Sequence, residues 1–155
     1  MAGKKIELSA TGATVAENLH RVRAGRPYTE LSKRLKETGR DIPPLALRRI
    51  EEGGRRVDAD DLVALAIALD VSPLTLLMPH AVGPSDDVSV TGVGGVVEAG
   101  RLWEWFTARR PLIDDSSAET FGFLYRSLPA WWLAKVRVLE QGFDSDLGRD
   151  DGDGR

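Results

Sequence analysis

Apolar residues recur at helical spacing in five short stretches between residues 13 and 80. A spacing of three or four residues places side chains on one face of an α-helix, and glycine or proline residues mark most of the ends. In the fourth stretch, Leu62, Leu65 and Leu69 follow Asp58, which is the expected N-cap. The pattern therefore predicts an all-α domain of five short helices, over about 14–24, 27–38, 43–52, 59–69 and 73–78.

The third of these helices, residues 43–52, has the clearest boundaries. Prolines suit its first turn, where the missing N–H would have no intrahelical partner, and Gly53 can end it in a left-handed conformation. Ala46, Leu47 and Ile50 form one apolar stripe. Two arginines, a leucine and a glutamate fall largely outside this stripe, so we expect a helix that buries one side and presents cations on the other.

Weaker patterns surround this domain. Residues 1–12 are expected to form a flexible arm, and the glycine-rich residues 81–97 a linker. Residues 98–141 are expected to be a mostly helical, tryptophan-rich accessory segment. Residues 142–155 combine aspartate with glycine and are expected to be a disordered acidic tail.

Within the accessory segment, apolar spacing predicts a helix over 98–110 and a second one that ends at Pro129. The second helix begins at a capping box, with Ser116 and Glu119 three residues apart. A third helix follows around the last two tryptophans, although residues 136–138 fit a strand equally well.

Charge is divided unevenly along the chain, whose formal net charge is −3. Residues 1–56 contain 13 Lys and Arg against 7 Asp and Glu, whereas residues 57–155 contain 8 against 17. The first part therefore carries +6 and the second −9. A basic region within an acidic protein indicates an anionic partner for that region and a different role for the rest.

The sequence gives little support for a metal-binding protein, an enzyme or a membrane protein. The chain has no cysteine, and His20 and His80 are isolated, so we expect no metal site and no other cofactor. No catalytic set of residues stands out, and the glycines at 92–95 lack the Lys-Ser/Thr of a phosphate loop, so we expect no enzyme. No apolar run is long enough for a membrane span and no signal peptide is evident, which favours the cytoplasm.

Four stretches of the chain together form a recognisable pattern: Glu30-Leu31-Ser32, Leu47-Arg48-Arg49-Ile50-Glu51-Glu52-Gly53, the run from Leu62 to Pro73, and Leu76-Leu77. This succession resembles the lambda-repressor-like, Cro-type (xenobiotic-response-element) helix-turn-helix regulators, in their actinobacterial form. The resemblance implies a five-helix DNA-binding domain over residues 13–80. It also implies a sequence-specific transcriptional regulator, expected to be a repressor, that reads the major groove of double-stranded DNA with helix 43–52.

The resemblance also implies roles for individual residues. Pro44, Leu45 and Arg49 take outward positions that face base edges in the family, and Tyr28 and Thr29 lie where relatives contact phosphate. Arg21 and Glu51 correspond to a buried ion pair. The sequence departs from the family in a longer turn between the second and third helices, and in Pro-Pro-Leu where polar side chains are common.

The chemistry of helix 43–52 agrees with these roles. The guanidinium of Arg48 or Arg49 can donate two parallel hydrogen bonds to guanine, and Leu45 can pack on a thymine methyl group. Arg55 and Arg56, just beyond the helix, suit phosphate contacts, which give affinity without sequence information. Alternatively, the helical arginines form only a solvated surface that complements the helix dipole.

Two other functions remain open. The domain could be a protein-interaction module, such as an antitoxin-like adaptor, or a ligand-sensing regulator with an apolar pocket in the C-terminal segment. Residues 98–141 hold more aromatic side chains than an isolated segment can bury, so we also expect a homodimer. The alternative is that this segment binds a separate protein partner.

Overall fold

The computed structural model describes residues 7–113 and 117–135. The protein is mostly helical, and the predicted all-α class with a five-helix N-terminal bundle is confirmed. The chain divides into two units, one ending at Trp103 and the other beginning at Glu104. None of the described helices is both long and apolar enough to cross a membrane.

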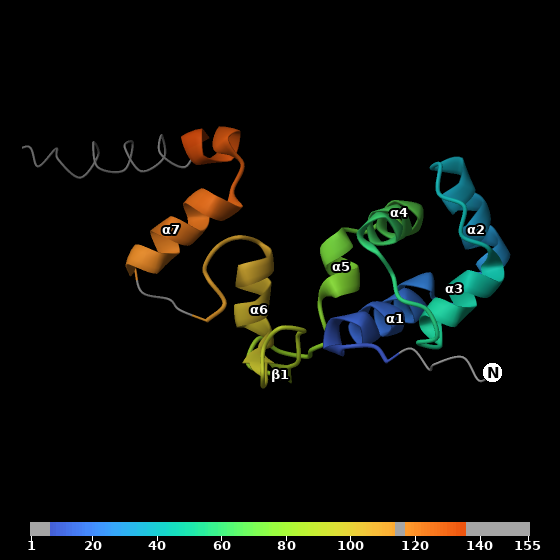
Figure 1. Cartoon of the computed structure of the whole chain (residues 1–155), viewed down its shortest axis with the longest axis horizontal. Coiled ribbons are helices and arrows are strands. Elements are labelled where there is room, and N and C mark those ends of the chain that lie inside the picture. The colour runs from blue at the N-terminus through green and yellow to red at the C-terminus, as the bar shows by residue number, and fades with distance from the viewer. Residues whose placement is uncertain (1–6, 114–116, 136–155) are drawn as a thin grey trace, which may run out of the picture. The chain divides into compact units, whose positions relative to one another are not determined.

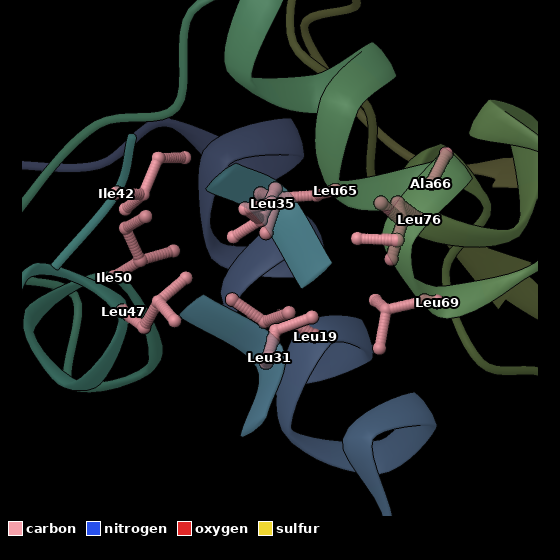
Figure 2. Close-up of a cluster of buried hydrophobic side chains, with 11 residues drawn as sticks. Leu19, Leu31, Leu35, Ile42, Leu47, Ile50, Leu65, Ala66, Leu69 and Leu76 are labelled. Carbon is pink, nitrogen blue, oxygen red and sulfur yellow. The ribbon is translucent and has the colours of Figure 1, made fainter. Parts of the chain in front are cut away.

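The first unit begins with the bundle, in which α1 contacts α3 and α5, and α2 contacts α3 and α4 (Figure 1). Side chains from all five helices meet in one apolar core, and Leu35 lies in the middle of it in Figure 2. Leu19, Leu35, Leu47, Leu65 and Leu76 are completely buried. The five helices are α1 (Ala10–Arg23), α2 (Tyr28–Glu37), α3 (Pro44–Glu51), α4 (Ala59–Leu69) and α5 (Pro73–Leu77).

Capping residues act at the helix ends, among them the predicted N-cap Asp58. The Asp58 carboxylate accepts a hydrogen bond from the Asp61 N–H at 2.7 Å, and Ser72 Oγ accepts one from the Leu74 N–H at 3.2 Å. Gly39 follows α2 with a φ of +86°, a conformation that L side chains rarely adopt. These caps satisfy backbone groups that the helices leave unpaired, so short helices can begin and end at fixed residues.

The expected linker at 81–97 is wrong in part, because it contains a small hairpin. Strands β1 (Asp87–Val88) and β2 (Val97–Glu98) pair antiparallel, with Val88 opposite Val97. Val88 and Val90 are buried. Burial of these apolar side chains gives the segment a fixed structure despite its glycines.

The expected arm at 1–12 is also corrected over its described part, because α1 begins at Ala10. Thr11 and Thr91 exchange two hydrogen bonds of 3.0 Å, each N–H donating to the other hydroxyl oxygen. This pairing joins the start of α1 to the hairpin across 80 residues of sequence. Residues 1–6 lie outside the described part.

After the hairpin, α6 (Ala99–Phe106) crosses the boundary between the units. This helix is shorter than predicted, and Ala108 beyond it has a φ of +54°. In the second unit, α7 (Ser117–Ser127) agrees with the predicted second helix, and residues 130–135 are helical. The strand alternative at 136–138, the capping serine at 116 and the expected tail at 142–155 lie outside the described residues.

Candidate nucleic-acid interface

Helix α3 has one buried and one exposed face, as its sequence predicts. Leu47 and Ile50 are buried in the core, whereas Leu45 is 60% exposed. Arg48 and Arg49 are exposed beside it, as is the C-cap residue Glu52. We call the exposed set Leu45, Arg48, Arg49 and Glu52 the α3 face.

The C-terminal end of α3 is anchored by the buried carboxylate of Glu51, whose side chain is 5% exposed. Arg23, at the end of α1, donates from Nε to Oε1 at 2.6 Å and from Nη2 to Oε2 at 2.9 Å. The Tyr28 hydroxyl, at the start of α2, donates to Oε2 at 2.8 Å, and His20 Nδ1 lies 2.9 Å from the same oxygen. One carboxylate therefore joins three helices at a single point.

The pKa values around Glu51 reflect this geometry. Burial alone would raise the pKa of Glu51, but the hydrogen bonds from Arg23, His20 and Tyr28 outweigh it, and the pKa is lowered. The hydrogen bond to Glu51 raises the pKa of Arg23. Burial, followed by the hydrogen bond to Glu51, raises the pKa of the Tyr28 hydroxyl. The carboxylate is thus held charged, and the phenol neutral.

The prediction that Arg21 pairs with Glu51 is wrong, because Arg23 occupies that position. Two residues along an α-helix are separated by about 200° around its axis, so Arg21 and Arg23 point in nearly opposite directions. The Arg21 side chain instead donates to Asn18 Oδ1, with its closer nitrogen at 3.0 Å. Arg23 also lies over the Tyr28 ring, 4.2 Å from its centroid, in a cation–π contact.

The long turn before α3 is fixed by hydrogen bonds and burial. The Arg40 N–H donates to the Leu35 carbonyl at 2.9 Å and the Gly39 N–H to the Lys36 carbonyl at 3.1 Å, which is the Schellman pattern. Ser32 Oγ donates to the Ile42 carbonyl at 2.8 Å, and the Ile42 side chain is buried. The additional residues of this turn therefore do not loosen the connection between α2 and α3.

A second buried carboxylate, Asp61, holds this turn and the turn after α3 against the start of α4. Its side chain is 1% exposed and accepts from Arg40 Nε and from Arg55 Nη2, each at 2.7 Å. Arg55 was predicted to contact phosphate, but its guanidinium is paired with this buried carboxylate, although its side chain is 36% exposed. Arg55 therefore contributes to the position of α3 and offers DNA less charge than its sequence position indicates.

The other predicted cations differ in their contacts. Arg48 Nε donates to Glu52 Oε1 at 2.8 Å, one helical turn away. Arg56 donates to the Glu7 carbonyl at 3.0 Å and is otherwise exposed. Among the described residues, Arg49 forms no hydrogen bond or ion pair, so its guanidinium is available to a ligand.

Helix α2 packs against α3. Thr29 is exposed in its first turn, whereas Tyr28 is half-buried, and Pro44 is half-buried at the start of α3. The pKa of Arg48 is raised, first of all by its hydrogen bond to Glu52.

Two exposed lysines on α2 were missed as candidate site residues. Lys33 and Lys36 follow Thr29 at helical positions i+4 and i+7, and neither forms an ion pair within the described chain. Their spacing from Thr29 was the signal that could have found them. The available cations of the bundle thus include two on α2 besides Arg49.

Comparisons with protein-family models, curated proteins and solved structures each gave no match. Within the described residues, no group of three or more His, Asp or Glu side chains is arranged to hold a metal ion. Function is therefore inferred from the α3 face itself.

Proposed function

We propose that this protein binds double-stranded DNA sequence-specifically through the α3 face and acts as a transcriptional regulator of the lambda-repressor-like helix-turn-helix type. The observation that carries the proposal is an eight-residue helix with two exposed arginines, held at both ends by buried carboxylates. The major groove, about 12 Å wide, accepts one α-helix. We expect repression as the outcome and the cytoplasm as the location.

Rigidity supports a reading role for this helix. Base recognition needs side chains held in place before DNA arrives, because ordering them on binding costs free energy. Glu51 fixes the end of α3, and Asp61 fixes the turns on either side of it. A face that served only solubility would need no such anchoring.

The positions of the charged residues suggest that some contact bases and others contact phosphates. Arg49, on the α3 face, is placed to donate to guanine O6 and N7. We assign the exposed Lys33 and Lys36 on α2, with Arg56 beyond α3, to the DNA backbones that border the groove. The exposed hydroxyl of Thr29, in the first turn of α2, is a further candidate for a phosphate contact.

Two variants test this assignment by fluorescence anisotropy on a selected duplex and a random one, at several salt concentrations. Arg49→Ala should weaken binding to the selected duplex by roughly 1–3 kcal/mol and relax the preference at one base pair. Arg56→Ala should weaken binding to both duplexes and lower the salt slope by about one. Equal losses on both duplexes for both variants would contradict the assignment, and affinity independent of salt would favour the protein-interaction module.

We further propose that the second unit makes the protein a homodimer. Phe121, Trp131 and Trp132 are all exposed there, with Trp131 at 65%. Aromatic side chains are enriched in the centres of protein interfaces. A dimer would place two α3 helices about one DNA turn apart, roughly 34–36 Å, and so double a short recognition surface.

Sedimentation of the full chain at tens of micromolar, with and without a selected duplex, tests this second proposal. We expect a dimer that Trp131→Ser weakens. A full chain that stays monomeric under both conditions would exclude self-association, and a separate protein partner would then be sought.

A further inference from the structure

Glu52 is an acidic residue in the middle of the α3 face. Viewed down the axis of α3, the position of Glu52 lies between those of Arg48 and Arg49 and close to that of Leu45. A carboxylate here is repelled by DNA phosphates and by the oxygen and nitrogen acceptors that dominate the major-groove edge. A residue that only maintained affinity for DNA would not be acidic at this position.

The contact between Arg48 and Glu52 leaves part of each side chain available. Arg48 donates from Nε to Glu52 Oε1 at 2.8 Å, and the two side chains are 62% and 57% exposed. Within the described residues, the terminal nitrogens of Arg48 and the second oxygen of Glu52 have no other partner. The pair therefore presents a two-donor fork beside one acceptor.

We propose that Glu52 is a specificity determinant, which positions the Arg48 fork on a guanine and itself accepts a hydrogen bond from the amino group of a neighbouring cytosine. This inference rests on the proposed DNA binding. It names the preferred site as one that contains a guanine and a cytosine at adjacent base pairs beneath the C-terminal half of α3.

The chemistry of the base edges selects cytosine. A carboxylate has only acceptors, so it needs a donor, and the major groove offers donors at cytosine N4 and adenine N6 alone. Adenine carries its N7 acceptor next to N6, which repels a carboxylate, whereas cytosine has no acceptor on that edge. Guanine and thymine present acceptors and are rejected.

The same carboxylate acts against binding at random sequence. Where no amino group meets Glu52, its second oxygen has no donor and lies next to phosphates and base acceptors. The wrong duplex is then penalised as well as the right one favoured. Replacing Glu52 with glutamine removes this charge and supplies a donor and an acceptor together. Such an amide suits adenine, to which it can bond through N6 and N7.

The test is selection of bound duplexes from a randomised pool by the full-length wild type, Glu52→Gln, Arg48→Lys and the control Asp70→Asn. Asp70 is an exposed carboxylate at the C-cap of α4, in a left-handed conformation that asparagine tolerates. The control therefore changes the net charge equally while leaving the α3 face intact. Far-UV circular dichroism establishes that each variant is folded.

We expect Glu52→Gln to exchange cytosine for adenine at one position and to bind random duplex more tightly than the wild type. The wild type should discriminate against the exchanged base by about 5- to 150-fold, as for other single base-pair mismatches. Arg48→Lys should relax the guanine next to it, and Asp70→Asn should select the wild-type sequence.

The possible failures are distinguishable. If the wild type shows no salt-dependent binding to any duplex, the proposed function and this inference both fall. If the wild type binds and selects a sequence, but Glu52→Gln selects the same bases at every position, DNA binding stands and the role of Glu52 is refuted.

Discussion

Glu51 and Glu52 are neighbours in the chain and each pairs with one arginine, yet we expect their removal to have very different effects on stability. The pair of Glu51 with Arg23 is buried, with side-chain exposures of 5% and 9%. The pair of Glu52 with Arg48 lies in solvent, with 57% and 62%. Replacing each glutamate with glutamine removes the same charge from two environments, so each variant controls for the other.

The expected magnitudes follow from burial. In Glu51→Gln, the Arg23 guanidinium loses its counter-charge while it remains buried, and such stranding costs roughly 3–5 kcal/mol. The glutamine carbonyl still accepts one hydrogen bond, so we take the lower figure of about 3 kcal/mol. Glu52→Gln loses a surface pair one helical turn apart, worth about 0.3–0.5 kcal/mol. Since small domains have unfolding free energies of about 5–15 kcal/mol, only the first loss is large.

Urea and thermal unfolding of the full chain, followed by far-UV circular dichroism, measure this difference. We expect Glu51→Gln to lower the Tm by about 12 °C or more, and Glu52→Gln by about 2–4 °C at most. Arg23→Met combined with Glu51→Gln should lose less than the sum of the two single variants, because no charge is then stranded. Additive losses, or a Glu51→Gln variant as stable as Glu52→Gln, would refute the anchoring of α3 by this pair.

Three further predictions concern the same framework. The pKa of Glu51 is lowered in the folded state, so the unfolded state takes up the proton first as the pH falls. The free energy of unfolding should therefore decrease as the pH drops below 4.5, the ordinary pKa of glutamate. In a pH titration of Tm, Glu51→Gln should flatten this part of the curve. Asp61→Asn should cost about 1–3 kcal/mol in urea unfolding, since the carboxylate is buried between two arginines. Gly39→Ala should lower the free energy of unfolding by about 1–2 kcal/mol, since the φ of Gly39 is +86°. Gly54 has no positive φ, so the control Gly54→Ala should change it by no more than about 0.5 kcal/mol in the same assay.

The helical bundle could be predicted from the sequence because its signals are local. Apolar spacing, the N-caps Asp58 and Ser72, and the glycine after α2 each act within about one helical turn. The two faces of α3 were predictable for the same reason, since Leu47 and Ile50 fix which side is buried.

The remaining features depend on residues far apart in the chain. To predict that Arg23 rather than Arg21 pairs with Glu51, one needs the rotation of α1 about its axis relative to α3. Neither helix encodes this rotation alone. The ordering of the hairpin depends partly on Thr11 and Thr91, which are 80 residues apart. Composition alone indicates a flexible linker there, because glycine content carries no information about a distant partner.

Because pairing between distant residues cannot be seen in the composition, net charge is also a poor measure of the proposed DNA-binding surface. Residues 1–56 carry +6 in the sequence, but buried carboxylates bind Arg23, Arg40 and Arg55 and fix them as parts of the framework. Arg49 remains unpaired within the described chain, since the acid next to it on the helix, Glu52, pairs with Arg48 instead. Burial of Glu51 and Asp61 thus decides both how rigidly α3 is held and which cations remain for a ligand. Substitutions at these two acids should therefore change DNA affinity and stability together, whereas substitutions at Glu52 should change DNA recognition with little effect on stability.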